Sequence, residues 1–451
     1  MSNISLVNKS TPTTPGSGSG LLKKEDYWAV WIGLGTVILS IILWAAGSTA
    51  MPALAVSFPA WDQFSKVSVY FHSHWGGIVA LWFCFLVVFS IAVKVLGHNL
   101  KSFIPGFTIL FILGVIVSIL GASSLAKKWS LEPPLMALLV GLILGNVVPL
   151  PKWLDTAFRT EFYVKTGIVL MGATLPFTII LQSGPMAFLQ ATIVAVSTFL
   201  TIYWIGTRLF HLDKRFSTAL AAGGSICGVS AAIAIGGSVK AEKNHVSVAI
   251  SLVVVWAIIM VFALPIVIKA LGISPGPGGA WIGTSEFADA AGIAAAASIS
   301  EQAIKTFTLM KVVGRDMFVG IWCFIMALIA VTKWERREDG RKPNGKEIWF
   351  RFPKFVLGFF AASIVVTLLI ASVDAPTAKT VSANIVGPIS MIRLWAFIFT
   401  FLCIGLTTRF KELAAVGWRP FAAFTAGVIV NVPLGYILSV LVLGGYWTMV
   451  K

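Results

Sequence analysis

Five ionisable residues lie within the most apolar part of this 451-residue chain: Glu286, Asp289, Lys311, Arg315 and Asp316. An unpaired ion inside a lipid bilayer is costly, so such groups persist mainly where they meet a partner or line a path for a polar solute. The sequence therefore predicts a polar site enclosed by protein, and movement of a solute through a membrane is the first hypothesis.

Glu286 and Asp289 are the acidic members of this set. They are three residues apart, so on a helix both would point from one face, with their Cβ atoms about 5 to 6 Å apart. Two carboxylates this close repel each other in a low dielectric. Such a pair could bind a coupling cation or carry a proton. The alternative is a static ion pair with Lys311 or Arg315.

Lys311 and Arg315 are four residues apart and would also share one helical face, with Asp316 beside them. An anionic substrate needs fixed positive charge in a dry site, and arginine can hold an oxyanion through two parallel hydrogen bonds. The two cations are therefore candidates for substrate binding. Alternatively, they neutralise Glu286 and Asp289 across neighbouring helices.

A second segment, residues 219–239, is dense in glycine, alanine and serine. Glycine tolerates the unwound conformations that break a helix, and the free N–H groups at the start of a half-helix can hold an anion without a cationic side chain. The predicted substrate contacts in this segment are Gly224, Ser225, Ile226, Cys227, Gly228 and Ser230. Residues 281–299 have the same composition, and close helix packing without a ligand is the alternative for both.

The composition assigns the chain to the integral membrane proteins. Hydrophobic residues make up 57% and charged residues 12%, against roughly 25% charged residues in soluble domains. A helix needs about 20 apolar residues to cross hydrocarbon. Thirteen runs approach that length, at about 28–48, 77–97, 103–121, 134–149, 161–182, 187–207, 219–239, 246–271, 281–299, 306–332, 353–373, 388–408 and 420–445. The predicted fold is an all-α polytopic membrane protein with about thirteen transmembrane helices.

The basic residues indicate how these spans are oriented. With a cytoplasmic N-terminus, the inner loops would hold 20 Lys and Arg residues and the outer segments 8. This bias favours a cytoplasmic N-terminus and an external C-terminus. It also explains the net charge of +16 without a nucleic-acid partner, since the basic residues are spread over span ends and short loops.

Weak internal symmetry accompanies the two glycine-rich spans. The segments GGSICGVSAAIA, from Gly223, and GTSEFADAAGIA, from Gly283, share a G-x-S start followed by an alanine-rich run. GIVLMGATLPF, from Gly167, and FLCIGLTTRF, from Phe401, form a second pair. Repeats of this kind are typical of transporters built from inverted halves, which bind their substrate near the bilayer midplane.

Four motifs resemble the YeiH family of bacterial inner-membrane proteins, to which sulfate export has been attributed: AAGGSICGVSAAIAIGGSVKAE, YVKTGIVLMGATL, WIGTSEFADAAGIAAAASIS and CIGLTTRFKELAAVG. The resemblance covers roughly residues 125–445. It implies a multi-pass plasma-membrane transporter with inverted repeats and broken, crossing helices, similar to the cation/proton antiporter and bile-acid symporter group. The implied cargo is a small anion such as sulfate or an organosulfonate.

This hypothesis divides the chain into a disordered tail at 1–24, an N-terminal transmembrane extension at 25–122 and a transporter core at 123–451. Neither a metal nor a cofactor is expected, because the cysteines Cys84, Cys227, Cys323 and Cys403 lack metal-type spacing. We expect no enzymatic activity. The alternatives are a passive anion channel and an intramembrane enzyme with Ser225 as nucleophile, although the five histidines lie in loops or at span ends. Besides the lipid bilayer and the solute, a second copy of the chain is a candidate partner.

Overall fold

The computed structural model describes residues 24–128, 133–316, 322, 325–326, 328–330, 334, 354–409 and 417–450. All regular elements in these ranges are helices, and the β-type pairing among them is one isolated bridge between Trp61 and Ser123. The predicted all-α class is confirmed. The expected N-terminal tail at 1–24 falls almost entirely outside the described residues.

Eight described helical segments are long and apolar enough to cross a bilayer. They are α1 (Glu25–Ala45), α3 (Phe64–Val95), α4 (Leu100–Gly121), α8 (Phe177–Trp204) continued by η2 (Ile205–Leu209), α11 (Lys243–Ala270), α17 (Lys354–Ala371), α18 (Ala375–Val381) continued by η6 (Ser382–Val386) and α19 (Gly387–Thr407), and α21 (Trp418–Tyr436) continued by η7 (Ile437–Val442). The chain is thus a polytopic helical membrane protein.

The remaining described helices are shorter. They are α2 (Ala50–Leu54), α5 (Ser124–Lys128), α6 (Pro133–Val147), η1 (Lys152–Thr156), α7 (Thr160–Gly172), α9 (Lys214–Ser225), α10 (Val229–Ser238), α12 (Pro275–Ser285), α13 (Asp289–Ala297), α14 (Glu301–Thr308), η3 (Leu309–Val313) and α22 (Gly444–Met449). Five of the thirteen predicted spans fall on these shorter pieces, and one of the five, expected at 306–332, lies partly outside the described residues. The count of thirteen therefore stays a prediction.

One predicted boundary is wrong. We expected separate spans at 161–182 and 187–207, but α7 ends at Gly172 and α8 runs from Phe177. Pro176 lies at the N-cap of α8, where a proline ends the preceding helix because it restricts the residue before it. Pro185, which lies between the two expected spans, is inside α8. Membrane helices tolerate such an internal proline because neighbouring groups satisfy the freed carbonyl.

The start of α3 also differs from the prediction. This helix begins at Phe64, well before residue 77, so His72 and His74 lie on a helix and not in a loop. His74 stacks on Tyr70 with 4.1 Å between ring centroids. Within the described ranges, no group of three histidine, cysteine, aspartate or glutamate residues could hold a metal ion.

The N-terminal helix α1 packs against α7 and α17 of the predicted core. Gly33 of α1 lies so close to Val169 of α7 that a Cβ atom at position 33 would overlap the valine side chain. At the start of α1, Glu25 pairs with Arg159, and Asp26 lies 2.8 Å from Lys165 Nζ. The boundary at residue 122 is not tested, but α1 contacts the elements that carry the site.

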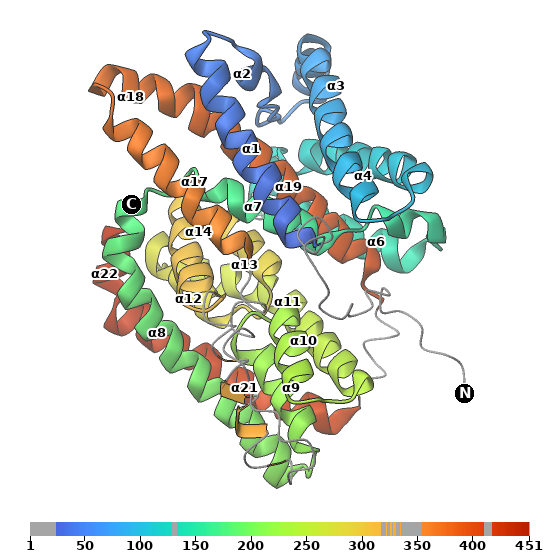
Figure 1. Ribbon diagram of the computed structural model, residues 1–451, viewed down its shortest axis with the longest axis vertical. Helices are drawn as coiled ribbons and strands as arrows, with labels where there is room; N and C mark the ends of the chain where they lie inside the picture. The colour runs from blue at the N-terminus through green and yellow to red at the C-terminus, as the bar shows by residue number, and fades with distance from the viewer. Residues whose placement is uncertain are drawn as a thin grey trace.

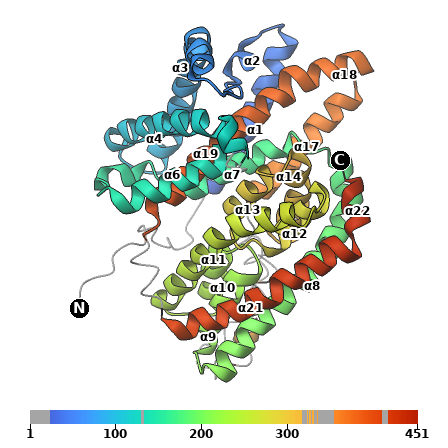
Figure 2. The same ribbon diagram turned by 180° about the vertical axis from the view of Figure 1, so that it is seen from behind.

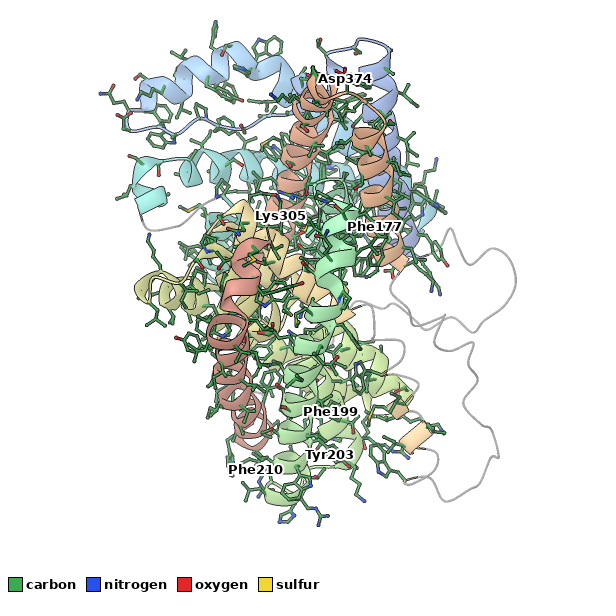
Figure 3. The ribbon with its side chains drawn as sticks, turned by 90° about the vertical axis from the view of Figure 1, so that its left-hand side faces the viewer. Phe177, Phe199, Tyr203, Phe210, Lys305 and Asp374 are labelled. Carbon is green, nitrogen blue, oxygen red and sulfur yellow. The ribbon has the colours of Figure 1, made fainter. Side chains whose placement is uncertain are left out.

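The helices form two groups, seen from opposite sides in Figure 1 and Figure 2. One group contains α1, α3, α4, α6, α7, α17 and α19, and the other contains α8 to α12, α21 and α22. Figure 3 shows α8 along the second group, with Phe177 at its start and Phe210 just beyond its far end. The short helix α13 lies between the two groups, next to α6 and α19, and it also contacts α11 and α12 of the second group.

Candidate functional site

Two broken helices form the centre of the site. The first consists of α9 and α10, separated by Ile226–Gly228, and the second of α12 and α13, separated by residues 286–288. Both leading half-helices end on the serine of the shared G-x-S pattern, Ser225 in α9 and Ser285 in α12. The weak repeat in the sequence therefore coincides with the two points where the helices break.

The two breaks touch each other at Gly228. This residue has φ +71° and ψ −119°, a backbone conformation that is open essentially to glycine alone. A Cβ atom at position 228 would also overlap the carbonyl group of Phe287 in the second break. The ring of Phe287 is fully buried and lies 5.4 Å from the ring of Phe424 in α21. Gly228 is thus required both for the turn and for the close approach of the two breaks.

Lys311, in η3, binds both breaks through its ammonium group. Its Nζ atom donates hydrogen bonds to the carbonyl oxygens of Ile226 at 3.1 Å and Glu286 at 3.3 Å, and it lies 3.4 Å from Asp289 Oδ1. The lysine side chain has no exposed surface. Lys311 therefore stabilises the negative, carboxyl-terminal ends of α9 and α12 together.

Arg315 binds the same two helix ends. Its Nη2 atom donates to the carbonyl oxygen of Ser225 at 2.7 Å, and Nη1 donates to those of Gly283 at 2.9 Å and Thr284 at 3.0 Å. The last carbonyl groups of a helix have no partner within the helix. Arg315 supplies these partners, so its fork of donors is directed at the main chain.

Glu286 and Asp289 do not share a helical face as the spacing suggested, because the helix is broken between them. Glu286 follows the end of α12 with extended backbone, whereas Asp289 begins α13. Glu286 is fully buried, and its Oε1 atom accepts the N–H groups of Phe287 at 2.9 Å and Ala288 at 3.3 Å. Its Oε2 atom has no hydrogen-bond partner within the described ranges. The Glu286 carboxylate thus accepts hydrogen bonds from the two amide groups, of Phe287 and Ala288, that directly precede α13.

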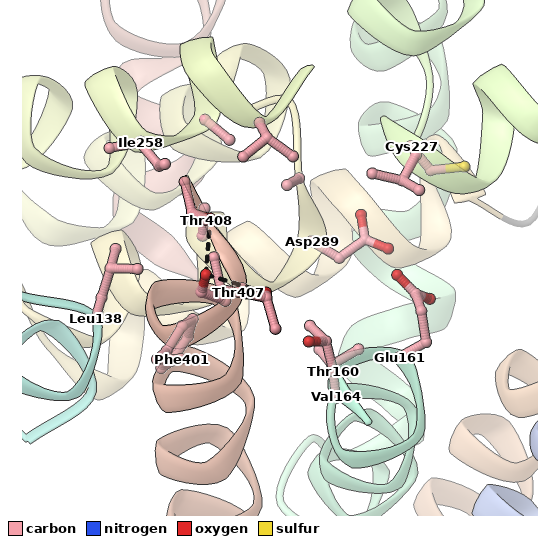
Figure 4. Close-up of a pocket in the computed structure, with 16 residues that line it drawn as sticks. Leu138, Thr160, Glu161, Val164, Cys227, Ile258, Asp289, Phe401, Thr407 and Thr408 are labelled. Carbon is pink, nitrogen blue, oxygen red and sulfur yellow. Dashed lines mark hydrogen bonds between the residues drawn. The ribbon is translucent and has the colours of Figure 1, made fainter. Parts of the chain in front are cut away.

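A cavity of about 280 Å³ reaches both breaks (Figure 4). Cys227 and Val229 line it from the first break, and Ala288 and Asp289 line it from the second. Its other walls come from the start of α7 with Thr160 and Glu161, the end of α19 with Thr407 and Thr408, and apolar residues of α6, α11 and α19. The cavity therefore meets the amino ends of two half-helices, α10 and α13.

Glu161 is the site residue that the sequence analysis missed. Its carboxylate points toward that of Asp289 in Figure 4, and Lys165 Nζ lies 3.4 Å from it. Glu161 and Asp289 are the charged residues among those that line the cavity. An acid in the first turn of a helix is common because it favours the helix dipole, so nothing in the sequence singled Glu161 out.

The predicted substrate contacts in the first broken helix separate into two environments. Ser225 and Ile226 line a different, apolar cavity of about 170 Å³, and the Ser225 hydroxyl donates to the carbonyl oxygen of Ala221. Gly224 is buried, and a Cβ atom there would meet Ile202 and Phe424. Cys227 faces the larger cavity. The Ser230 side chain lies outside the described residues.

Comparison with known proteins identifies the chain's relatives. A family model described as "Conserved hypothetical protein 698" matches residues 105–424. The UPF0324 membrane protein RB9488 of Rhodopirellula baltica is 34% identical over 373 residues, which cover 82% of this chain and 68% of the relative. The UPF0324 membrane protein NE0724 of Nitrosomonas europaea is 32% identical over 448 residues, which cover 88% of this chain and 91% of the relative.

A UPF0324 membrane protein of Nitratidesulfovibrio vulgaris is 31% identical over 363 residues, and the match covers 78% of this chain but only 62% of the relative. No solved structure matches the chain. The resemblance seen in the four sequence motifs is confirmed: this chain belongs to the UPF0324, or YeiH, family of membrane proteins.

Proposed function

We propose that this protein is a secondary transporter of a small oxyanion, such as sulfate or an organosulfonate, in the bacterial inner membrane. The observation that carries the proposal is the cavity of about 280 Å³ at the amino ends of α10 and α13. The amino end of a helix carries partial positive charge and free N–H groups, which makes it suited to hold an anion. Broken helices that meet inside a membrane protein are typical of transporter substrate sites.

The two breaks differ in a way that favours an anion at the first. At the second break the carboxylate of Glu286 covers the N–H groups of Phe287 and Ala288. The corresponding residue of the first break is Ile226, whose side chain carries no carboxylate to cover the amides of Cys227 and Gly228. Glu286 thus illustrates how a carboxylate fits such a break, and a substrate oxygen would take the corresponding place beside Cys227.

The acidic lining of the cavity explains why transport would be coupled. Glu161 and Asp289 would repel an anion in a low dielectric, where unscreened charges interact strongly. An anion therefore enters together with protons or cations that neutralise these acids. Glu286 and Asp289 remain our candidates for coupling, and Lys311 and Arg315 supply positive charge from behind the breaks.

The predicted orientation of the spans indicates on which side of the membrane this cavity lies. With a cytoplasmic N-terminus and an external C-terminus, the start of α7 and the end of α19, which line the cavity, lie on the cytoplasmic side. At the other end of α7, Arg393 of α19 donates to Thr174 Oγ1 at 2.8 Å and to Glu301 Oε2 at 3.2 Å. These contacts would close the external side, as alternating access requires.

A flux assay in proteoliposomes tests the proposal. We expect saturable sulfate or sulfonate flux that is accelerated by the same anion on the opposite side, which distinguishes a carrier from a passive channel. Asp289→Asn should remove the dependence of this flux on a pH gradient, whereas Asp374→Asn, at an exposed loop position, should not. The absence of anion flux in the wild-type protein, with cation flux in its place, would overturn the proposal.

A second candidate, a cation carrier, is favoured by one observation. Both charged residues that line the cavity are acids, and a cation would need no co-transported proton to approach them. Flux of a monovalent cation that persists without any small oxyanion would support this candidate. Ser225→Ala is informative for both, because a hydroxyl that donates to Ala221 and faces the other cavity should be dispensable for either cargo.

A further inference from the structure

Asp316 is a buried acid to which neither the cavity nor the two breaks assign a role. It follows Arg315 directly and is 1% exposed. Neither of its carboxyl oxygens has a hydrogen-bond partner in the part of the chain that the structure describes. Buried polar atoms are nearly always hydrogen-bonded, so two unpaired oxygens on one carboxyl group require an explanation.

The two cations on the same segment, Lys311 and Arg315, do not donate a hydrogen bond to Asp316. Lys311 donates to two main-chain carbonyl oxygens and pairs with Asp289, and both terminal nitrogens of Arg315 donate to main-chain carbonyl oxygens. The Nε atom of Arg315, however, is also buried without an acceptor among the described residues. Two consecutive residues therefore hold an unused donor and two unused acceptors.

The surroundings decide which charge state of Asp316 fits this arrangement. An ionised carboxylate that is buried without a donor is far more costly than a neutral carboxyl group. Among the described residues, the charged and titratable groups that interact with Asp316 are Lys311 and Arg315 on its own segment, Asp289 from α13, Glu161 from α7 and Cys227 from the first break. The acids oppose its ionisation. The cations favour it, but their donors are turned toward the helix ends.

We propose that Asp316 is a proton-carrying residue whose charge state controls where Arg315 binds. In the conformation described here, Asp316 is protonated and Arg315 holds the carboxyl-terminal ends of α9 and α12. When Asp316 releases its proton to water, the carboxylate attracts Arg315, and the guanidinium leaves the carbonyl groups of Ser225, Gly283 and Thr284. Loss of the proton thus loosens the contact between the two breaks.

This inference rests on the proposed function only for its consequence in transport. If the breaks bind the anion, the protonation of Asp316 sets the affinity of that site and links the proton to the conformational change. The protonation itself can be measured without any substrate. A failure of the transport assay therefore leaves the inference on Asp316 testable on its own.

Infrared spectroscopy of the purified protein in lipid, without added anion, provides the test. We expect a C=O stretching band of a protonated carboxyl group at neutral pH that shifts when aspartate is labelled with carbon-13, and that Asp316→Asn abolishes. Glu286→Gln is the matched control and should leave the aspartate band in place. If Asp316→Asn does not fold, Asp289→Asn takes its place: the aspartate band should survive in this variant, and its loss there would assign the band to Asp289 and overturn the inference.

The same samples report the switch through hydrogen exchange. Raising the pH should lower the protection factors, that is, the ratios of the intrinsic base-catalysed exchange rate to the observed rate, at residues 223–228 and 283–288 in the wild-type protein, whereas in Asp316→Asn the protection factors should not change with pH. The inference is overturned if no aspartate carboxyl band exists at neutral pH, if the band survives in Asp316→Asn, or if the protection factors of this variant fall with pH as those of the wild type do.

Discussion

The carbonyl oxygens of Ile226 and Glu286 bind one nitrogen atom, Lys311 Nζ, at 3.1 and 3.3 Å. The two residues occupy the same position in the two broken helices, directly after the serine of the G-x-S pattern. A single ammonium group therefore joins the two helix ends by donating to a carbonyl group of each, and Arg315 Nη1 adds a second donor to that of Glu286 at 3.4 Å. This arrangement explains how two breaks can meet in an apolar environment, where each unsatisfied main-chain group is costly.

Replacing Lys311 tests whether this lysine holds the two helix ends together. Lys311→Met keeps a side chain of similar length but leaves Asp289 without its ion pair and the Ile226 carbonyl without its Lys311 donor, while the Glu286 carbonyl keeps only its 3.4 Å bond from Arg315 Nη1. Breaking a buried ion pair in this way costs about 3–5 kcal/mol, so we expect a large loss of thermal stability in detergent or lipid. Lys305→Met, on α14 at a partly exposed position, is the matched control and should unfold close to the wild-type temperature.

A double substitution separates the ion pair from the carbonyl contacts. Asp289→Asn in the Lys311→Met background removes the unpaired carboxylate and should recover part of the lost stability, because contacting residues do not contribute additively. Wild-type stability of Lys311→Met alone would contradict the role that we assign to this lysine.

Gly228 is the position where substitution should be least tolerated. Gly228→Ala forces an alanine into a positive-φ conformation, which costs roughly 1–3 kcal/mol, and its Cβ atom would overlap the Phe287 carbonyl. We expect the breaks to separate and the variant to lose both stability and anion flux. Gly237→Ala, in the same half-helix with open space around its Cβ position, should be neutral or stabilising. Equal unfolding temperatures for the two variants would refute the close contact of the breaks.

The sequence predicted some parts of this site better than others. Glycine and alanine density predicted that both helices could break, but the residue at which each leading half-helix ends, the serine of the G-x-S pattern, came from the structure. The spacing of Lys311 and Arg315 placed them on one side of a helix, but spacing does not reveal what a neighbouring helix presents. Their main-chain partners on α9 and α12 could therefore not be predicted. Glu161 was missed because its partner across the cavity, Asp289, is remote in sequence.

Two substitutions of Glu286 should differ in their effect on stability. Glu286→Ala leaves the N–H groups of Phe287 and Ala288 without an acceptor in a buried site, which costs about 1–3 kcal/mol. Glu286→Gln retains an oxygen that can accept both bonds and should lose less. Thermal unfolding of both variants at one pH measures the difference. A glutamine variant as unstable as the alanine variant would mean that the negative charge, and not the acceptor, stabilises the break.

Anion binding should strengthen as the pH falls. Protonation of Glu161 removes negative charge from the cavity wall, so an anion meets less repulsion at low pH than at high pH. A ligand that binds only the folded protein stabilises it, by about 2.7 kcal/mol at a concentration of 100 times its Kd. The increase in melting temperature caused by sulfate should therefore grow from high to low pH. In the double variant Glu161→Gln, Asp289→Asn this growth should become smaller while sulfate still stabilises the protein, because the amino ends of α10 and α13 remain and Asp316 still titrates. An increase that grows with rising pH would contradict an anion in this cavity, and stabilisation by cations alone would assign the cavity to the cation carrier.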